Sequence, residues 1–222
     1  MRRLWGLALV ALALLAAQAS EAKVEPYRSS VQPLPAPVKG LLRERAWRPG
    51  CPVPLSGLRL LTVSHWGFDG KARAGQLVVN RDVAVPLAKV FRRLYELRFP
   101  LRHMQLTDLY GPARDRPAGG DVTGSFFCRQ AAASPCTGRA RTGTWSNHAY
   151  GLAIDVNPVE NPYVGCGMTR DPTARRYLDR SRLRKGMVTP AVVSAFRAIG
   201  WGWGGYWSGQ TKDYMHFSHN GR

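Results

Sequence analysis

The chain has 222 residues, of which 45% are hydrophobic and 10% aromatic, so it can bury a proper core and is not wholly disordered. Its 23 glycines and 16 prolines indicate one folded domain that is rich in loops. Lysine and arginine outnumber aspartate and glutamate by 32 to 14, and the formal net charge of +18 suggests a polyanionic neighbour: nucleic acid, anionic lipid or an acidic cell-wall polymer.

The first residues have the pattern of a secretory signal peptide. Two arginines follow the initial methionine, residues 4–17 are almost wholly apolar, and Ala-Gln-Ala at 17–19 offers a cleavage site, with Ser-Glu-Ala at 20–22 as an alternative. A membrane anchor is the competing interpretation, but the apolar run is shorter than the roughly 20 residues needed to span a bilayer. We therefore expect residues 1–19 to be a signal peptide and the protein to be secreted, periplasmic or cell-wall associated, without a stable membrane span. Because an exported protein is separated from DNA, we expect no nucleic-acid partner.

The next segment, residues 20–50, contains several prolines and few apolar pairs, so we expect an extended arm or linker before a domain at 51–222. Within that domain, β-branched and leucine-rich runs predict strands at 58–63 and 76–79. Residues 82–98 carry apolar side chains at helical spacing and predict the clearest helix.

The second half of the chain mixes further short elements with loops. We expect a strand at 104–110, a loop at 111–147, and strands at 152–157 and 214–218. A helix is predicted at 190–199, because Thr189 suits the N-cap and Pro190 the first helical position. The order has too few helices for alternating βαβ units, so we predict an α+β fold with a mainly antiparallel sheet and helices packed on one side.

Four cysteines in an exported chain indicate two disulfides. Three pairings are possible, and the short loop between Cys128 and Cys136 favours that bridge, which leaves Cys51 with Cys166 by elimination. A zinc site built from all four cysteines is disfavoured because no C-x₂-C spacing occurs.

Four polar residues near predicted strands form a candidate site: His148, Asp155, Asp213 and His216. Asp155 is a carboxylate inside an apolar strand, which is costly unless it is paired or metal-bound. Two imidazoles and one carboxylate form a zinc set with a fourth position open, and a remaining carboxylate can act as general base. Spacing alone leaves a second interpretation open, in which these are ordinary hydrogen-bonded residues. Residues three apart on a regular strand face opposite sides, so Asp213 and His216 share a site only if Asp213 precedes the strand or a bulge intervenes.

Three local sequences resemble a known family. SNHAYGLAIDVNP at 146–158, WGWGG at 201–205 and DYMHF at 213–217 contain S-x-H-x-x-G-x-A-x-D and a later D-x-x-H near a Trp-Gly segment. This is similar to the VanY-type D-alanyl-D-alanine carboxypeptidases and the L-alanyl-D-glutamate endopeptidases of phage endolysins. The resemblance covers about residues 60–220 and implies the fold shared by lysostaphin, D-Ala-D-Ala carboxypeptidases and the hedgehog amino-terminal domain.

The resemblance implies a zinc ion held by three ligands, namely His148, Asp155 and His216. It makes Asp213 the catalytic carboxylate. Arg129, in GSFFCR at 124–129, becomes a catalytic or substrate-binding arginine, although the cysteine inside that segment departs from the family pattern. Ser146 is expected to contact substrate or to position the first ligand loop.

The function implied is that of an exported zinc metallopeptidase that hydrolyses peptide bonds in peptidoglycan stem peptides, with a muropeptide as substrate. Either a D,D-carboxypeptidase-like or an L-Ala-D-Glu endopeptidase-like activity is compatible with these motifs. The alternative is a non-catalytic, zinc-stabilised cell-wall binding domain on the same fold. A nucleic-acid-binding protein would need neither this ligand set nor an export signal.

Other conspicuous residues receive plainer interpretations. We expect His219 to point away from the metal, and His65 and His103 to be structural or surface groups. Tryptophans could line a substrate groove or pack against the helix at 190–199; these are Trp201, Trp203 and Trp207. The basic run at 175–185 is a solvated face or a contact for an anionic polymer.

Overall fold

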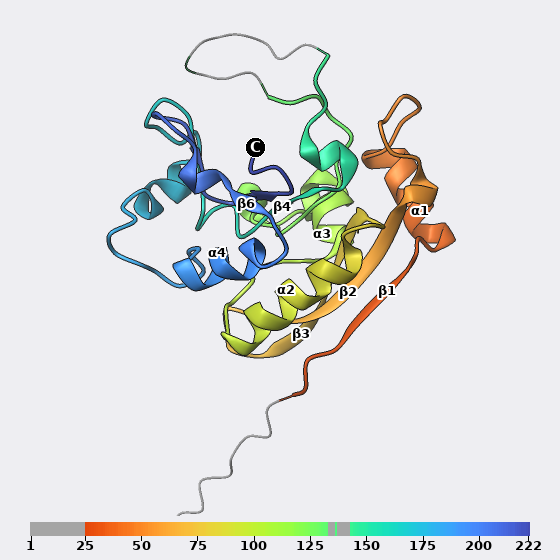
Figure 1. The fold of residues 1–222 in the computed structure, drawn as a ribbon, viewed down its shortest axis with the longest axis horizontal. Helices are drawn as coiled ribbons and strands as arrows, with labels where there is room; N and C mark the ends of the chain where they lie inside the picture. Colours follow the sequence, from red (N-terminus) through yellow and green to blue (C-terminus); the bar gives the residue numbers. More distant parts are fainter. Residues whose placement is uncertain (1–24, 133–135, 137–142) are drawn as a thin grey trace, which may run out of the picture.

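The computed structural model describes residues 25–132, 136 and 143–222 (Figure 1). The predicted signal peptide, residues 1–19, lies outside the described residues. Short helices and three small antiparallel sheets alternate along the chain, so the predicted α+β class with mainly antiparallel pairing is confirmed. Among the described residues, no helix has the length and apolar character required to cross a membrane.

The largest sheet has the order β1-β2-β3. Its strands are β1 (Ser29–Pro33), β2 (Leu58–Trp66) and β3 (Ala72–Asn80). β2 and β3 form a hairpin whose register runs from Leu58 opposite Asn80 to Trp66 opposite Ala72. Both predicted strands in this region are therefore confirmed, and both extend beyond the predicted bounds.

Helices cover both faces of this sheet, where a single helical layer was expected. On one face lies α2 (Ala84–Glu96), which packs against alternate residues of β2 and β3: Leu61, Val63, Leu77 and Val79. On the other face lie α1 (Ala36–Arg45) and α3 (Leu106–Tyr110), which pack near Leu58, Leu60 and Val78. Two helical layers form because β2 has buried apolar residues at both even and odd positions, so each face needs a cover.

The sequence predicted an extended arm or linker at 20–50, but residues 29–45 form a strand and a helix that belong to the fold. β1 pairs with β2 along its whole length, and α1 buries Leu42 completely in the cluster that includes Leu58 and Phe126. The prolines that suggested a linker occupy positions where they are tolerated. Pro33 ends an edge strand, where a missing N–H costs no ladder bond, and Pro37 lies in the first turn of α1.

The strand expected at 104–110 is wrong, because residues 106–110 form α3. Leu106 and Tyr110 lie four residues apart and are both buried, which is helical spacing. The segment is too short for periodicity to separate the two possibilities, since the same apolar residues also fit an alternating pattern.

The second sheet has the order β4-β8-β6 and the third pairs β5 with β7. Their strands are β4 (Ala153–Asp155), β5 (Tyr163–Val164), β6 (Gly202–Trp203), β7 (Lys212–Asp213) and β8 (His216–Ser218). The strands predicted at 152–157 and 214–218 are thus present in shorter form. The helix α4 (Pro190–Arg197) is capped by Thr189, whose hydroxyl accepts from the N–H of Val192 at 3.4 Å. Its Phe196 stacks on Phe217 of β8 with ring centroids 3.9 Å apart.

Six 3-10 helices complete the described chain. They are η1 (Leu55–Gly57), η2 (Ala113–Asp115), η3 (Ala118–Gly120), η4 (Asn147–Tyr150), η5 (Pro172–Tyr177) and η6 (Gly204–Tyr206). Two of them belong to the site described below. η4 carries the candidate metal ligand His148, and Gly204 of η6 lies against Asp213.

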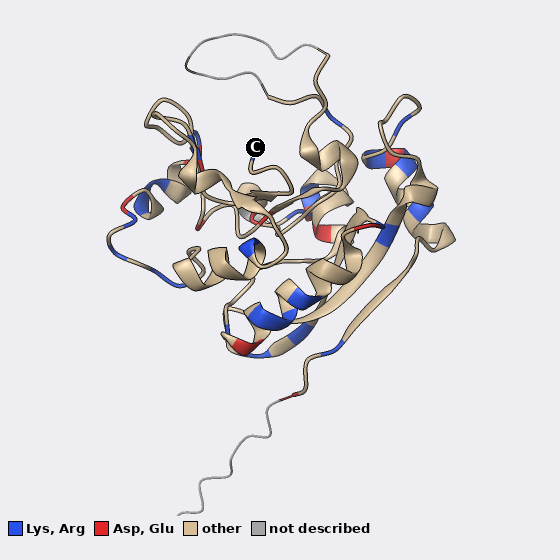
Figure 2. Cartoon of the chain, in the orientation of Figure 1, with Lys and Arg blue, Asp and Glu red and all other residues tan. Residues whose placement is uncertain are grey.

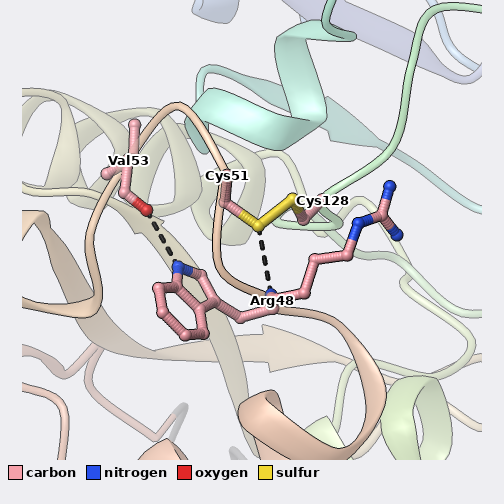
Figure 3. Close-up of a disulfide and its surroundings, with 5 residues drawn as sticks. Arg48, Cys51, Val53 and Cys128 are labelled. Carbon is pink, nitrogen blue, oxygen red and sulfur yellow. Dashed lines mark hydrogen bonds between the residues drawn. A yellow bond between two sulfur atoms is a disulfide. The ribbon is translucent and has the colours of Figure 1, made fainter.

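The disulfide pairing differs from the predicted one. Cys51 bonds to Cys128, with Cα atoms 5.9 Å apart (Figure 3). Cys136 bonds to Cys166, with Cα atoms 5.3 Å apart. The shortness of the Cys128–Cys136 loop did not predict the pairing. The backbone N–H of Cys128 donates to the carbonyl of Ala46, which lies beside the turn that carries Cys51, so Cys128 is held near Cys51. Long-range packing of α1 therefore decides the partner, and loop length does not.

Basic side chains are distributed over several elements. Figure 2 shows Lys and Arg on α1, on α2 and along the stretch before α4, with few acidic residues among them. Within the basic run at 175–185, Arg175, Arg182 and Arg184 are exposed. Arg180 is different, because its guanidinium donates to the Asn161 side chain at 3.2 Å and to two backbone carbonyls. Arg180 is therefore a structural residue within that otherwise solvated run.

Candidate metal centre

His148 is held by a tight turn between the two larger sheets. It lies in η4, where the hydroxyl of Ser146 caps the turn by accepting from the backbone N–H of His148 at 3.3 Å. Gly151 ends the turn with a left-handed φ of 66°, and a Cβ atom there would lie 2.6 Å from the backbone nitrogen of Asn80. Only glycine lets the turn approach β3 so closely. The predicted positioning role of Ser146 has this contact as its structural basis.

Strand pairing brings the other two candidate ligands together. In the antiparallel ladder of β4 and β8, Asp155 lies directly opposite His216. Residues directly opposite each other in such a ladder have Cβ atoms about 4.5–5.5 Å apart and project from the same face. The segment around Gly124 bridges the other side of Asp155, with N–H to carbonyl bonds of 3.0 Å and 2.9 Å in the two directions. That bridge also brings the neighbouring Ser125 close to η4.

Three side chains converge on one point. The Nε2 atom of His148 lies 3.2 Å from the Nδ1 atom of His216 and 3.2 Å from Oδ2 of Asp155, and the Nδ1 atom of His216 lies 3.1 Å from Oδ1 of Asp155. They form a group of three potential metal ligands on buried or half-buried residues. Ligand atoms that surround zinc tetrahedrally at about 2.0–2.2 Å lie about 3.3–3.6 Å apart, so the observed spacing is close to that of a zinc set.

Main-chain oxygens fix the tautomer of both imidazoles. The Nδ1 atom of His148 lies 2.6 Å from the carbonyl oxygen of Ser125, and the Nε2 atom of His216 lies 3.1 Å from the main-chain oxygen of Arg222. A carbonyl or carboxylate oxygen only accepts hydrogen bonds, so each of these ring nitrogens carries the hydrogen. The opposite nitrogen of each neutral ring then presents a lone pair to the common point, which is the arrangement that metal-ligating histidines have.

The donor set fits a cation. With both tautomers fixed as described, the 3.2 Å contact between Nε2 of His148 and Nδ1 of His216 joins two lone pairs. The carboxylate of Asp155 faces the same point, so negative electrostatic potential accumulates there. A divalent ion between these atoms would satisfy all three groups at once. Two imidazoles and one carboxylate with a further position open are ligands that zinc accepts in peptidases.

The carboxyl group of Asp155 is ionised in this setting. Burial opposes its ionisation, but in the metal-free cluster the positive charge and hydrogen bonds that protonated His148 and then protonated His216 would supply outweigh burial and hold the pKa of Asp155 well below its usual range. With both rings neutral, a divalent ion at the common point would supply that positive charge instead. Asp155 is therefore a carboxylate at neutral pH, which is the form that coordinates a metal.

Asp213 lies in β7 opposite Tyr163 of β5, and so it precedes the strand that carries His216. This satisfies the geometric condition for Asp213 and His216 to share one site. Gly204 allows the approach, because a Cβ atom there would lie 2.5 Å from the carbonyl oxygen of Asp213. That close contact gives a physical reason for glycine in the WGWGG sequence.

The carboxyl group of Asp213 is unusual in its environment. Its Oδ1 atom is buried and has no hydrogen-bond partner among the described residues. Burial first, and then the negative charge of Asp155, raise the pKa of Asp213 to about 7, although His216 and Arg129 oppose the shift. A buried carboxyl group that titrates near neutrality beside a ligand cluster is suited to accept and release a proton.

A cavity of about 200 Å³ opens at the ligand cluster. Its lining includes His148 and Asp155, the exposed Arg129 and Phe127, and the segment at 124–126. Arg129 therefore lines the cavity, which is compatible with its interpretation as a catalytic or substrate-binding residue. The Cys51–Cys128 bridge ties the residue before Arg129 to the α1 side of the fold.

Residues outside the cluster have structural contacts. Trp201 is buried against Phe196, the indole N–H of Trp203 donates to the carbonyl of Tyr214 at 2.8 Å, and that of Trp207 donates to the carbonyl of Gly221 at 2.6 Å. Of the two roles considered for the tryptophans, packing is the one these contacts support. Three histidines lie apart from the ligand group: buried His65, half-exposed His103 and exposed His219.

Sequence reasoning missed two groups that act through their backbone. The main-chain oxygens of Ser125 and Arg222 orient the two imidazoles, and a main-chain oxygen leaves no residue-type signal in a sequence. Ser125 lies inside GSFFCR, a segment that the resemblance had already singled out, but for a different residue.

Comparison with protein families adds an independent observation. Residues 139–219 match the family model described as D-alanyl-D-alanine carboxypeptidase, a range that contains η4, β4, β7 and β8. Comparison with curated proteins and comparison with solved structures each give no match. Over residues 139–219, this chain therefore has the sequence pattern of the D-alanyl-D-alanine carboxypeptidase family, which is the family that its SNHAYGLAID and DYMHF sequences indicated.

Proposed function

We propose that the protein is an exported zinc metallopeptidase that hydrolyses peptide bonds in peptidoglycan stem peptides. Its activity would be D,D-carboxypeptidase-like or L-Ala-D-Glu endopeptidase-like. The observation that carries the proposal is the convergence of His148, Asp155 and His216 with both imidazole lone pairs directed at one point, next to the unpaired buried oxygen of Asp213. The family match over the same segment supports the peptidase class.

His148, Asp155 and His216 would hold the zinc ion and leave one position open toward the cavity. Zinc bound there supplies Lewis acidity, which polarises the peptide carbonyl and makes a water molecule acidic near neutral pH. The main-chain oxygens of Ser125 and Arg222 would keep the imidazoles in the ligating tautomer.

Asp213 would move the proton. As a carboxylate it accepts a proton from the attacking water while the water oxygen adds to the peptide carbon. It then returns that proton to the nitrogen of the leaving amine as the carbon–nitrogen bond breaks. Because both transfers use one group, a pKa near the working pH suits each of them, and burial, with the charge of Asp155, raises the pKa of Asp213 to about 7.

Arg129 would act on the substrate. This exposed residue lines the cavity, where its guanidinium can stabilise the negative oxygen that develops on the attacked carbonyl or bind a substrate carboxylate bidentately. A removed hydrogen-bond donor at a developing oxyanion costs on the order of 3 kcal/mol in other enzymes. Ser146 would serve the site through η4, since its hydroxyl caps the turn that carries His148.

An exported location is supported by two observations. The pattern of residues 1–19 is that of a signal peptide, and the two disulfides are bonds that persist in oxidising compartments. The formal charge of +18 favours residence near an acidic cell-wall polymer. A secreted, periplasmic or cell-wall-associated location follows from the proposal.

Two variants separate metal binding from proton transfer. Asp213→Asn removes charge and basicity with little change in shape, so it should keep zinc and fold while hydrolysis falls by about 10²-fold or more. His148→Ala should lose zinc and hydrolysis together. Zinc content, measured by elemental mass spectrometry, and cleavage of purified muropeptides, followed by product mass spectrometry, are determined on the same preparations.

The matched controls are Asp82→Asn, on a largely exposed side chain, and His103→Ala, outside the ligand group; both should behave as wild type. Near-normal cleavage by Asp213→Asn would remove its catalytic role. A wild-type protein that binds zinc but cleaves no muropeptide would favour the alternative, a zinc-stabilised binding domain. The masses of the products identify which stem-peptide bond is cut.

A further inference from the structure

The exposed side of α2 carries cations that no acid neutralises. Lys89 and Arg92 lie on α2, Arg98 follows its C-cap, and all three are exposed. Within the part of the chain that the structure describes, none of the three takes part in an ion pair, whereas the neighbouring Arg93 is paired with Glu96 at 3.1 Å. Figure 2 shows Lys and Arg along this helix. We call Lys89, Arg92 and Arg98 the α2 cations.

Aromatic rings support the two guanidiniums. The guanidinium carbon of Arg92 lies 5.4 Å from the ring centroid of Tyr27, and that of Arg98 lies 4.8 Å from the ring centroid of Trp66. The ring of Tyr95 lies between these two rings, with its centroid 5.7 Å from that of Tyr27 and 4.9 Å from that of Trp66. A continuous series of ring contacts therefore joins the two arginines.

The rings themselves are fixed by hydrogen bonds. The hydroxyl of Tyr27 donates to the carbonyl of Ala88 at 2.6 Å, and that of Tyr95 donates to the carbonyl of Glu25 at 2.6 Å. The indole N–H of Trp66 donates to the carbonyl of Tyr95 at 2.8 Å. A guanidinium above the face of such a ring is attracted to it and keeps its donors free for a bidentate contact with phosphate. The two arginines are thus pre-organised to bind phosphate groups.

Two kinds of polyanion fit this surface poorly. A helix that enters a lipid bilayer exposes several apolar side chains, but Val85 is the one large apolar residue that α2 exposes. Single-stranded nucleic acid stacks its bases on exposed aromatic rings, whereas Trp66 and Tyr95 are buried. A flexible polymer with phosphate groups along its chain requires only cations at the surface, which the α2 cations provide.

We propose that the α2 cations form a docking surface for a phosphate-bearing polymer of the cell wall, with the guanidiniums of Arg92 and Arg98 as its main phosphate contacts. Charge complementarity carries the proposal, and the choice of a wall polymer rests on the proposed exported location. None of the three residues lines the cavity at the candidate metal centre. The polymer would therefore hold the protein in the wall without entering the site.

The experiment measures binding to poly(glycerol phosphate), immobilised on a sensor surface, at several salt concentrations. Circular dichroism checks that each variant is folded. Wild type is compared with three variants: the triple variant Lys89→Gln/Arg92→Gln/Arg98→Gln, the triple variant Arg175→Gln/Arg182→Gln/Arg184→Gln, and the double variant Arg92→Lys/Arg98→Lys. The second triple variant is the matched control, because it removes the same charge from exposed residues of the basic run at 175–185. The lysine variant keeps the net charge but removes both guanidiniums.

The first triple variant should bind the polymer about 10-fold or more weakly, because hydrogen bonds between charged groups are lost. Its affinity should also depend less steeply on salt, since fewer counterions are released. The control should bind nearly as wild type, and the lysine variant should lie between wild type and the first triple variant.

Equal losses in the two triple variants would overturn the proposal, because net charge alone would then drive binding. Wild-type affinity in the first triple variant or in the lysine variant would also contradict it. A wild-type protein that binds phosphatidylglycerol vesicles but not the polymer would replace the wall polymer with a membrane surface.

Cleavage of soluble muropeptides by the same preparations separates this inference from the proposed function. All four proteins should cleave at equal rates, because the substituted residues lie outside the cavity. A wild-type protein that cleaves muropeptides but does not bind the polymer contradicts only the docking surface. A wild-type protein that binds the polymer but cleaves nothing contradicts only the proposed function.

Discussion

Asp121, Glu160 and Arg102 form a second buried charged group outside the candidate metal centre. The guanidinium of Arg102 lies 2.7 Å from the carboxylate of Asp121 and 2.5 Å from that of Glu160. Both acids are almost fully buried, and Oε2 of Glu160 has no hydrogen-bond partner among the described residues. One guanidinium thus serves two carboxyl groups, so keeping a proton on one of the acids relieves their repulsion.

The pKa of Asp121 makes this group a source of pH-dependent stability. Burial first, and then the charge of Glu160, raise that pKa from 3.8 to about 7. Between those two values, folded Asp121 keeps a proton that the unfolded chain has lost. The folded state then binds more protons, so the free energy of unfolding must fall as pH rises through this window. Each unit of raised pKa corresponds to about 1.4 kcal/mol.

Asp121→Asn should reduce that fall, because the amide stays neutral at every pH and can still accept from the backbone N–H of Val159. The measurement is urea unfolding at pH 5 and pH 8 with a chelator present, and the quantity compared is the change in unfolding free energy between the two pH values. Asp82→Asn, on an exposed carboxylate, is the control. Asp213 titrates in wild type, in Asp121→Asn and in Asp82→Asn alike, so its contribution to the pH dependence cancels when the proteins are compared. An unchanged pH dependence in Asp121→Asn would show that Asp121 is ionised throughout.

At the scale of elements, α1 illustrates how composition can mislead. Proline content indicated an arm, yet Leu42 is wholly buried in a cluster with Leu34, Leu60 and Val78. The local sequence of α1 is weakly amphipathic, and its partners are strands that follow it in the chain. A helix of this kind owes its stability mainly to tertiary packing, which a single local window does not reveal.

Leu42→Ala tests whether α1 belongs to the core. Truncating a fully buried leucine removes apolar contacts and leaves a cavity, so it should lower the free energy of unfolding by about 2–5 kcal/mol. Arg43→Ala, one residue further along the same helix and exposed, should change it by less than about 0.5 kcal/mol. Chemical denaturation of both variants gives the comparison. Equal, small effects would mean that residues 36–45 are an arm after all.

The site was easier to predict than the elements around it. Asp155 stood out because a carboxylate in an apolar strand requires partners, and the resemblance then supplied His148 and His216; the structure brings these three together. The sequence did not reveal α3 or the contact between His216 and the main-chain oxygen of Arg222. Five residues are too few for periodicity to separate helix from strand, and a backbone contact is independent of residue type. Motifs of reactive side chains are visible in sequence, whereas tertiary contacts of backbone and short segments are not.

At the scale of the whole molecule, the two disulfides join different parts of the chain. Cys51–Cys128 spans 77 residues and ties the turn after α1 to the segment that leads to Arg129. Cys136–Cys166 spans 30 residues and joins position 136 to the loop after β5. The predicted pairing failed because it weighed only loop length, while the fold brings Cys51 and Cys128 together at one apolar cluster.

The long bridge should stabilise the fold more than the short one. In the chain-entropy model, closing loops of these lengths stabilises the folded state by about 4.5 kcal/mol for Cys51–Cys128 and about 3.6 kcal/mol for Cys136–Cys166. Replacing both cysteines of a bridge by serine should therefore lower the unfolding free energy more for the first pair than for the second. Serine at position 128, which is buried, adds a desolvation cost in the same direction.

Urea unfolding of the two double variants measures this difference, and mass spectrometry of a non-reduced digest of wild type checks the pairing first. Peptides linked through Cys51–Cys128 and Cys136–Cys166 are expected; a Cys128–Cys136 peptide would restore the pairing that the sequence favoured. The same two double variants can be tested for zinc affinity and for cleavage of muropeptides. Neither bridge contains a candidate zinc ligand, so the Cys136–Cys166 variant should keep zinc. The Cys51–Cys128 variant should keep zinc too but cleave muropeptides more slowly, because the segment that carries Arg129 loses its attachment to the α1 side of the fold.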